Sequence, residues 1–244
     1  MRSPQRRVFL LGAAVVLGLA IVVALSEGGW NYLVWRFGER VLITDRLQQF
    51  APRVDPLWAS RCHHAGLPYP PARVLLLGLK AEKRLEVFAA DVKGPWKQLA
   101  HYPILAASGD AGPKLREGDN QVPEGVYHVA LLNPNSLFHV SLRVDYPNAE
   151  DREHGRIDGR EHLGGDIMIH GGQASIGCIA IGDPAIEEVF TLVARSGLEH
   201  VEIVICPHDF RHQSAAPTAV PAWMFTRYEE LRRIMAELPL AADH

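Results

Sequence analysis

The hydrophobic pattern of the chain changes twice. The run from Val8 to Leu25 holds 18 residues without a charge. Residues 30–50 then place apolar side chains at helical spacing, and from Arg73 onward short apolar runs alternate with turn residues. Five prolines interrupt the stretch between these parts: Pro52, Pro56, Pro68, Pro70 and Pro71. The pattern therefore predicts a membrane-targeting segment, a helical stalk with a proline-rich linker, and a β-rich domain.

The β-rich domain is predicted from seven apolar, β-branched runs bounded by Gly, Pro, Asn and Asp. These runs are RVLLLGL from Arg73, RLEVFAA from Arg84, YPILAAS from Tyr102, GVYHVALL from Gly125, FHVSLRV from Phe138, GDIMIH from Gly165 and HVEIVIC from His200. No internal repeat is present. The fold class expected is a β-rich α/β domain of the α+β kind.

Two helices are predicted within and after the β-rich part. Pro184–Ser196 has Asp183 as its expected N-cap, Pro at its first position and Gly197 beyond its end. Its expected buried face repeats at helical spacing: Ile186, Val189, Phe190 and Val193. After His208 a polar, proline-containing link leads to an amphipathic helix over Ala222–Leu238, for which docking or solvation is favoured over binding a partner.

These elements divide the chain into four parts. Residues 1–29 form a signal anchor or signal peptide, 30–72 a helical stalk and linker, 73–208 the catalytic-sized domain, and 209–244 a C-terminal linker and helix. Eighteen residues of helix span about 27 Å, close to the roughly 30 Å of a bilayer's hydrocarbon core, which favours an uncleaved anchor. Arg2, Arg6 and Arg7 precede the apolar run, so the rest of the chain is expected to be exported to the periplasmic face of the inner membrane, or to the periplasm if the signal is cleaved.

Composition narrows the possible functions. The chain has 244 residues, 48% of them hydrophobic, and its formal net charge is −3. A core can therefore be buried, and no global basic field exists to hold nucleic acid. Three cysteines, Cys62, Cys178 and Cys206, are too few for a disulfide framework, and at least one stays unpaired within the chain.

The densest chemical pattern is GGDIMIHGGQASIGCIAIGD, from Gly164 to Asp183. A strand, a tight Gly171-Gly172 turn and a short return loop bring His170 close to Cys178. Such an imidazole can act as base for a thiol, a backbone carbonyl of the turn can orient the ring, and backbone N–H groups at Gly177 and Cys178 are expected to stay free as an oxyanion hole. On residue type alone, such a pair is more often structural than catalytic.

The segment Ile169-His170-Gly171-Gly172, followed by Ser175-Ile176-Gly177-Cys178, resembles the signature of YkuD-type L,D-transpeptidase catalytic domains. Two further segments resemble motifs of the same family: GDNQVPEGVY from Gly118 and SLFHVSLRVDYPNAED from Ser136. Together they cover roughly residues 73–207, and several motifs in the right order are more specific than one. The match is to the YafK-like branch of the family, and it implies an L,D-transpeptidase-like mixed β-sandwich with one or two packed helices.

The resemblance implies that Cys178 attacks the carbonyl of meso-diaminopimelate in a peptidoglycan stem peptide and forms a thioester, with His170 as proton acceptor and later donor. Gly171, Gly177 and Ser175 belong to the same site. Many members carry a second His where this chain has Ile176, as is usual in the YafK-like branch, so only His170 can be the base. An amine acceptor gives transpeptidation, which includes attaching a lipoprotein, whereas water gives a hydrolase that cuts such links. No cofactor or metal is needed.

A stem peptide carries several carboxylates, so cationic side chains are expected near the cleft. The candidates are Lys114, Arg116 and Arg143, with Tyr146 as a secondary contact in the cleft wall. For Arg143 a solvated face or local ion pair is the more common alternative. Ser175 either donates a hydrogen bond near the thiolate or caps the loop backbone.

Two other arrangements stay open. A Cys62–Cys206 bridge would leave Cys178 free, although Cys206 at the end of an apolar strand is better explained as a small buried hydrophobe. A zinc peptidase is a remote alternative, because five acidic and histidine positions cluster before His170 but show no metal-binding spacing such as H-E-x-x-H. Those positions are Glu153-His154, Glu161-His162 and Asp166.

Overall fold

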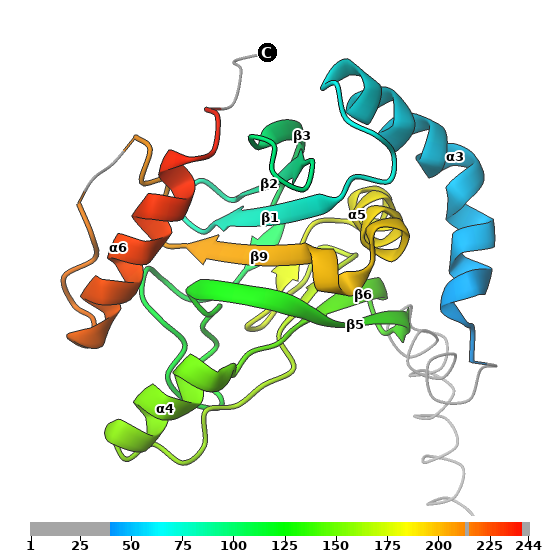
Figure 1. Ribbon diagram of the computed structural model, residues 1–244. Helices are drawn as coiled ribbons and strands as arrows, with labels where there is room; N and C mark the ends of the chain where they lie inside the picture. The colour runs from blue at the N-terminus through cyan, green and yellow to red at the C-terminus, as the bar shows by residue number, and fades with distance from the viewer. Residues whose placement is uncertain (1–39, 213–214, 241–244) are drawn as a thin grey trace, which may run out of the picture.

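The structure is a computed structural model that describes residues 40–212 and 215–240 (Figure 1). Its α-helices are α3 (Ile43–His64), α4 (Ala149–Ile157), α5 (Asp183–Ser196) and α6 (Trp223–Ala236), with a 3-10 turn η1 (Leu198–His200). Its strands are β1 (Arg73–Leu79), β2 (Arg84–Ala90), β3 (Lys97–Pro103), β4 (Ala106–Ala107), β5 (Gly125–Ser136), β6 (His139–Val144), β7 (Met168–His170), β8 (Ile179–Ala180) and β9 (Val201–Cys206). All seven apolar runs contain strand residues, and the mixed, sheet-rich α+β class is confirmed.

The strands form one mixed sheet with the order β3-β2-β1-β9-β5-β6-β7-β8-β4. Only the β1–β9 and β7–β8 pairs are parallel in this part of the chain. The long strand β5 joins two halves: Gly125–His128 pairs with β9, and a register shift after Val129 turns the rest toward β6. A register shift of this kind bends a strand and increases its twist. The second half of the sheet, β6-β7-β8-β4, carries the segment with the candidate chemistry.

Alternating side chains of β1 feed two separate cores. Val74 and Leu76 pack into a core with α3 and α5, whereas Leu75, Leu77 and Leu79 pack against α6. Figure 1 shows the same arrangement, with α6 on one side of the sheet and α5 and α3 on the other. The near-continuous hydrophobic run of β1 follows from this, because a strand covered on both faces has no polar side.

Helix α3 corrects the predicted proline-rich linker. Pro52 and Pro56 lie inside the helix on its exposed face, and they do not end it. A proline removes one helical hydrogen bond at a cost of about 3 kcal/mol, but the carbonyls released here can be met by water. The opposite face buries Phe50, Val54, Trp58 and Cys62. Packing therefore overrides the local signal, and residues 43–64 are part of the core and not a separate stalk.

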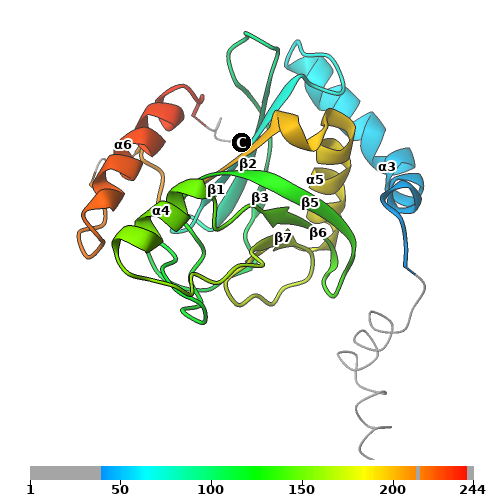
Figure 2. The same ribbon diagram turned by 60° about the horizontal axis from the view of Figure 1, so that its bottom comes forward.

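The two later helices follow the prediction with one change. Helix α5 begins at Asp183 with Gly182 as N-cap, so Asp183 is not the cap. All four residues of its expected inner face are buried. Helix α6 is docked, with Met224, Tyr228, Leu231 and Met235 buried, and Figure 2 shows it on the same side of the molecule as α4.

The cysteines are all unpaired, so the Cys62–Cys206 bridge is wrong. Cys62 lies on α3, and the Cys206 sulfur contacts the Met235 sulfur at 3.4 Å in the core under α6, so the sheet separates the two. Cys206 is fully buried, as expected of a small hydrophobe.

No helix within residues 40–212 and 215–240 combines the length and hydropathy needed to cross a bilayer. The predicted membrane segment, residues 8–25, lies outside the described ranges.

Candidate active site

The parallel pair β7–β8 brings the two candidate catalytic residues to one place. Ile169 pairs with Ile179 and His170 with Ala180. Cys178 directly precedes β8, at the end of a loop of residues 171–177, so it lies two residues before the strand partner of His170. The sequence predicted this approach from the eight-residue spacing.

The His170 ring is held in one orientation by its own turn. Nδ1 lies 2.6 Å from the Gly171 carbonyl oxygen, and the ring stacks on Phe138 with centroids 4.7 Å apart. A carbonyl can only accept, so Nδ1 carries the proton and Nε2 of the neutral ring is free to accept one. Burial lowers the pKa of His170 from 6.5, and the hydrogen bond to Gly171 offsets this only in part. The expected orienting carbonyl is therefore present, and the ring is neutral at neutral pH.

The atoms around Gly171 leave no room for a side chain at this position. A Cβ atom there would lie 2.3 Å from Asp183 Oδ1 and 2.9 Å from the Phe138 carbonyl oxygen. The same Asp183 oxygen accepts a hydrogen bond from Gly172 N at 2.7 Å. Asp183 therefore ties the turn after His170 to the start of α5, a role that the sequence did not reveal because Asp183 was explained as a helix cap.

The Cys178 thiol is half-buried and contacts the Asp166 carbonyl oxygen at 3.6 Å. Burial raises the pKa of this thiol above 9.0, while the Met168 N–H and the charge of Lys114 lower it by less. Hydrogen bonding from an N–H favours a thiolate, whereas desolvation disfavours it. The resting pair is thus a neutral thiol beside a neutral imidazole.

The backbone N–H groups expected to be free are both occupied, which corrects the prediction. Gly177 N donates to Ser108 Oγ at 2.6 Å, and Cys178 N donates to Ser175 Oγ at 3.0 Å. Ser175 is therefore a cap for the loop backbone. Ser108 also donates to the Asn120 carbonyl at 2.7 Å and joins three loops, but it lies in no motif, so no sequence signal marked it.

Two of the predicted substrate contacts, Lys114 and Tyr146, are buried and make their hydrogen bonds within the protein. Lys114 is buried, with its Nζ 2.7 Å from Asp119 Oδ1 and 3.0 Å from the Arg116 carbonyl oxygen. Burial alone would raise the pKa of Asp119, but the hydrogen bonds from Lys114 and three backbone N–H groups lower it. The buried Tyr146 hydroxyl lies 3.2 Å from two carbonyl oxygens, those of Lys114 and Leu163.

The other two candidates are accessible. Arg116 is exposed, and Arg143 is half-buried, lines a cavity of about 440 Å³ and lies 3.0 Å from Asp166 in an ion pair. Because Asp166 also contacts the thiol through its carbonyl oxygen, Arg143 belongs to the neighbourhood of Cys178, and Arg116 has no such link.

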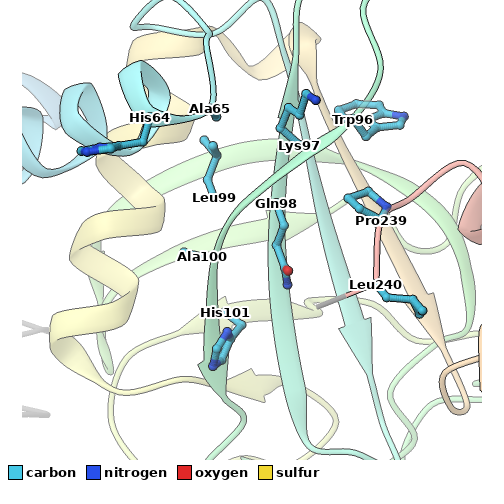
Figure 3. A pocket seen from close by; sticks show the side chains of 10 residues that line it. All are labelled: His64, Ala65, Trp96, Lys97, Gln98, Leu99, Ala100, His101, Pro239 and Leu240. Atoms are coloured by element: carbon cyan, nitrogen blue, oxygen red, sulfur yellow. The ribbon is translucent and has the colours of Figure 1, made fainter. Parts of the chain in front are cut away.

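The positions weighed for zinc do not form a metal centre. Across the ranges that the structure describes, no three His, Cys, Asp or Glu side chains are placed to hold a metal ion. His154 instead stacks on Trp223, with ring centroids 4.1 Å apart. Another cavity, of about 490 Å³, lies along β3 at the far end of the sheet order from β7 and β8 (Figure 3). None of its lining residues is a predicted site residue.

The chain is similar in sequence to known proteins. The family profile described as "L,D-transpeptidase catalytic domain" (YkuD) matches residues 76–205, more than half of the chain. "Putative L,D-transpeptidase YafK" of Escherichia coli (strain K12) is 35% identical over 133 residues, which are 52% of this chain and 51% of YafK. The chain thus spans about half the length of the curated relative it matches.

Solved structures show weaker similarity. The helical cell shape determining protein Pgp2 from Campylobacter jejuni has 25% identity and a TM-score of 0.44, over 55% of this chain and 47% of Pgp2. Bd1075 of Bdellovibrio bacteriovorus has 20% identity and a TM-score of 0.41, over 68% of this chain and 56% of Bd1075. On the strength of the profile match, the chain belongs to the YkuD family of L,D-transpeptidase catalytic domains.

Proposed function

We propose that this domain transfers the acyl group of a peptidoglycan stem peptide through a thioester on Cys178. The observation that carries the proposal is that β7 and β8 bring a half-buried thiol, directly before β8, close to one oriented, neutral imidazole at the end of β7. A thiol needs a base to become a strong nucleophile near neutral pH. His170 Nε2 can accept its proton, since the ring holds its own proton on Nδ1 and no hydrogen bond to Nε2 is present among residues 40–212 and 215–240.

The acylation step moves one proton twice. The thiol turns from the Asp166 carbonyl toward His170, Nε2 takes its proton, and the sulfur attacks the carbonyl carbon at the L,D bond. The protonated imidazole then gives the proton to the departing amine, and the thioester remains. A thiol–imidazole hydrogen bond need not be formed in the resting enzyme, since such bonds often tighten only with substrate bound.

The tetrahedral intermediate needs donors for its oxyanion. The N–H groups of Gly177 and Cys178 can serve only if the hydroxyls of Ser108 and Ser175 give way to the substrate oxygen. Both partners are short side chains whose hydroxyls can rotate, so this exchange requires no backbone rearrangement.

We propose transfer ahead of hydrolysis because a transferase must bind two substrates, a donor and an acceptor. Residues 164–183, which contain His170 and Cys178, line two separate cavities. Asp166 lines the cavity of about 440 Å³, whereas Gly172, Gln173 and Asp183 line another of about 460 Å³. The second candidate is a hydrolase of the same fold that releases a peptide or a lipoprotein. It shares the acylation step, and water resolves its thioester.

The proposal includes an exported location. Residues 8–25 would hold the domain at the periplasmic face of the inner membrane, where peptidoglycan stem peptides are its partners and a peptidoglycan-linked lipoprotein is a further partner of the hydrolase. Cell-shape control would follow from such activity on the wall.

Mass spectrometry of peptidoglycan fragments tests the proposal. The fragments are incubated with residues 40–244 or with the Cys178→Ala variant, whose fold is checked by circular dichroism. Cross-linked or amino-acid-exchanged peptides that vanish in the variant indicate transfer, and shortened stems or released protein indicate hydrolysis. Full activity in Cys178→Ala would contradict the mechanism.

A further inference from the structure

The cavity of about 440 Å³ beside the nucleophile loop has an unusual lining. Six polar side chains line it: Arg143, Arg152, Glu117, Glu161, His162 and Asp166. Asp166 connects this cavity to the reacting thiol, because its carbonyl oxygen lies 3.6 Å from Cys178 Sγ. A molecule that meets the thiol can therefore reach into this cavity.

Arg143 is held only loosely on this wall. Its Nη2 lies 3.0 Å from Asp166 Oδ1, but the Arg143 side chain is 40% exposed and the Asp166 side chain is 80% exposed. Ion pairs this open to water are weak, so a carboxylate from a ligand can replace or share Asp166. The planar guanidinium fork suits a carboxylate in particular.

Arg152 is a second guanidinium on the same wall, and no sequence motif pointed to it. Its Nη1 donates to the Pro147 carbonyl, and no carboxylate lies within ion-pair distance anywhere in residues 40–212 and 215–240. Arg143 and Arg152 also line an adjoining cavity of about 420 Å³. Both arginine side chains therefore border both cavities.

The acidic side chains of the cavity are equally unmatched. Within the part of the chain that the structure describes, neither Glu117 nor Glu161 has an ion-pair or side-chain hydrogen-bond partner, and both are exposed. Opposite charges that share a cavity without neutralising each other suit a ligand that itself carries both charges, since each group then gains a partner.

We propose that this cavity binds a zwitterionic amino-acid head group, one carbon that bears both an ammonium and a carboxylate. Arg143 and Arg152 bind the carboxylate, and Glu117 and Glu161 face the ammonium. The inference rests on the proposed function, in which the free end of meso-diaminopimelate supplies such a head group next to the scissile bond. Arg152 then determines specificity and takes no part in the chemistry.

Equilibrium binding to the Cys178→Ala protein tests this subsite. The probes are a stem tetrapeptide whose diaminopimelate carboxylate is free, the same peptide with that carboxylate amidated, and a third with the ammonium acetylated. A charged hydrogen-bond pair predicts that the free acid binds about tenfold more tightly than the amide. Arg152→Gln should bring this ratio close to one, and Glu161→Gln should reduce the preference for the free ammonium.

Arg156→Gln is the matched control, because Arg156 lies on the same helix, is 71% exposed and pairs with Glu153 outside the cavity. It should keep the wild-type ratio. Unchanged binding of the amidated peptide shows that Arg152→Gln is folded. The proposed subsite is wrong if the Cys178→Ala protein shows no preference for the free acid, or if adding Arg152→Gln to it leaves the tenfold preference unchanged.

Turnover of the same peptides by the protein with Cys178 intact separates the two proposals. Turnover without the Arg152-dependent preference removes the subsite alone. The preference without turnover removes the proposed reaction and keeps the subsite. Neither binding nor turnover removes both.

Discussion

Two clusters in this domain each bring acidic and basic side chains together, one in the core and one at an open cavity. Under α6, the fully buried Glu124 accepts hydrogen bonds from Lys80 Nζ at 2.9 Å, Gly112 N at 2.7 Å and the Tyr228 hydroxyl at 2.7 Å. Beside Cys178, in contrast, Arg152 and the two glutamates of the cavity have no ion-pair partner within the described residues.

The difference shows what decides the role of a charge. A buried charge must find its partners inside the protein, so the Glu124 cluster joins the loop before β5 to α6 and serves the fold. A charge at an open cavity can leave its partners to a ligand. Both clusters contain acidic and basic side chains, and burial and pairing distinguish their roles.

Removing Glu124 should have the largest effect on stability. Glu124→Ala leaves the Lys80 ammonium buried without its partner, which predicts a loss of about 3–5 kcal/mol in the free energy of unfolding. Urea denaturation measures it. Arg152→Gln, in the open cluster, should change the same quantity by no more than about 0.5 kcal/mol. Equal losses in the two variants would abolish the distinction between the clusters.

The pH dependence of the thiol separates the two catalytic groups. Because burial raises the pKa of Cys178 above 9.0, alkylation by iodoacetamide should rise about tenfold per pH unit from pH 7 up to pH 9 without a plateau.

Because burial lowers the pKa of His170 from 6.5, turnover should fall only when the pH drops below 6.5. His170→Ala should slow alkylation near neutral pH. A plateau in the alkylation rate below pH 8 would mean that Cys178 is already fully ionised there, and it would contradict a raised thiol pKa.

A smaller effect tests whether the open cluster reaches the thiol. Iodoacetate carries a carboxylate and iodoacetamide does not, so the ratio of their rates at Cys178 reports the local charge. Arg143→Gln should lower this ratio about two- to fivefold, with the effect screened by salt. Arg156→Gln should leave it unchanged. An equal ratio in both variants would place the Arg143 charge too far from the sulfur.

Much of the secondary structure could be predicted because strands depend on local patterns of apolar residues, whereas the order of strands in the sheet was not predicted. The apolar runs starting at Arg73 and Arg84 have the same bounds as β1 and β2. The prediction of a linker at Pro52 and Pro56 was wrong because the effect of a proline depends on which face of the helix is buried. Contacts with distant residues decide this, such as the hydrogen bond from Trp58 Nε1 to the Glu188 carbonyl oxygen at 2.8 Å.

The candidate site divides in the same way. His170, Gly171 and Cys178 lie in one short segment, so their approach follows from spacing. Ser108 and Arg152 come from other parts of the chain, and only the folded structure brings them to the loop and to the cavity. The cysteine bridge failed for the same reason, since sequence does not show which face of the sheet a cysteine occupies.

Intact-mass spectrometry of the protein after brief incubation with a stem tetrapeptide tests the central claim most directly. The account predicts an added mass equal to the acyl part of the peptide, located on Cys178 by peptide mapping and removed by hydroxylamine as a thioester is. The adduct should be absent in Cys178→Ala. Turnover of the peptide without any adduct on Cys178, or with the adduct on another residue, would contradict the account.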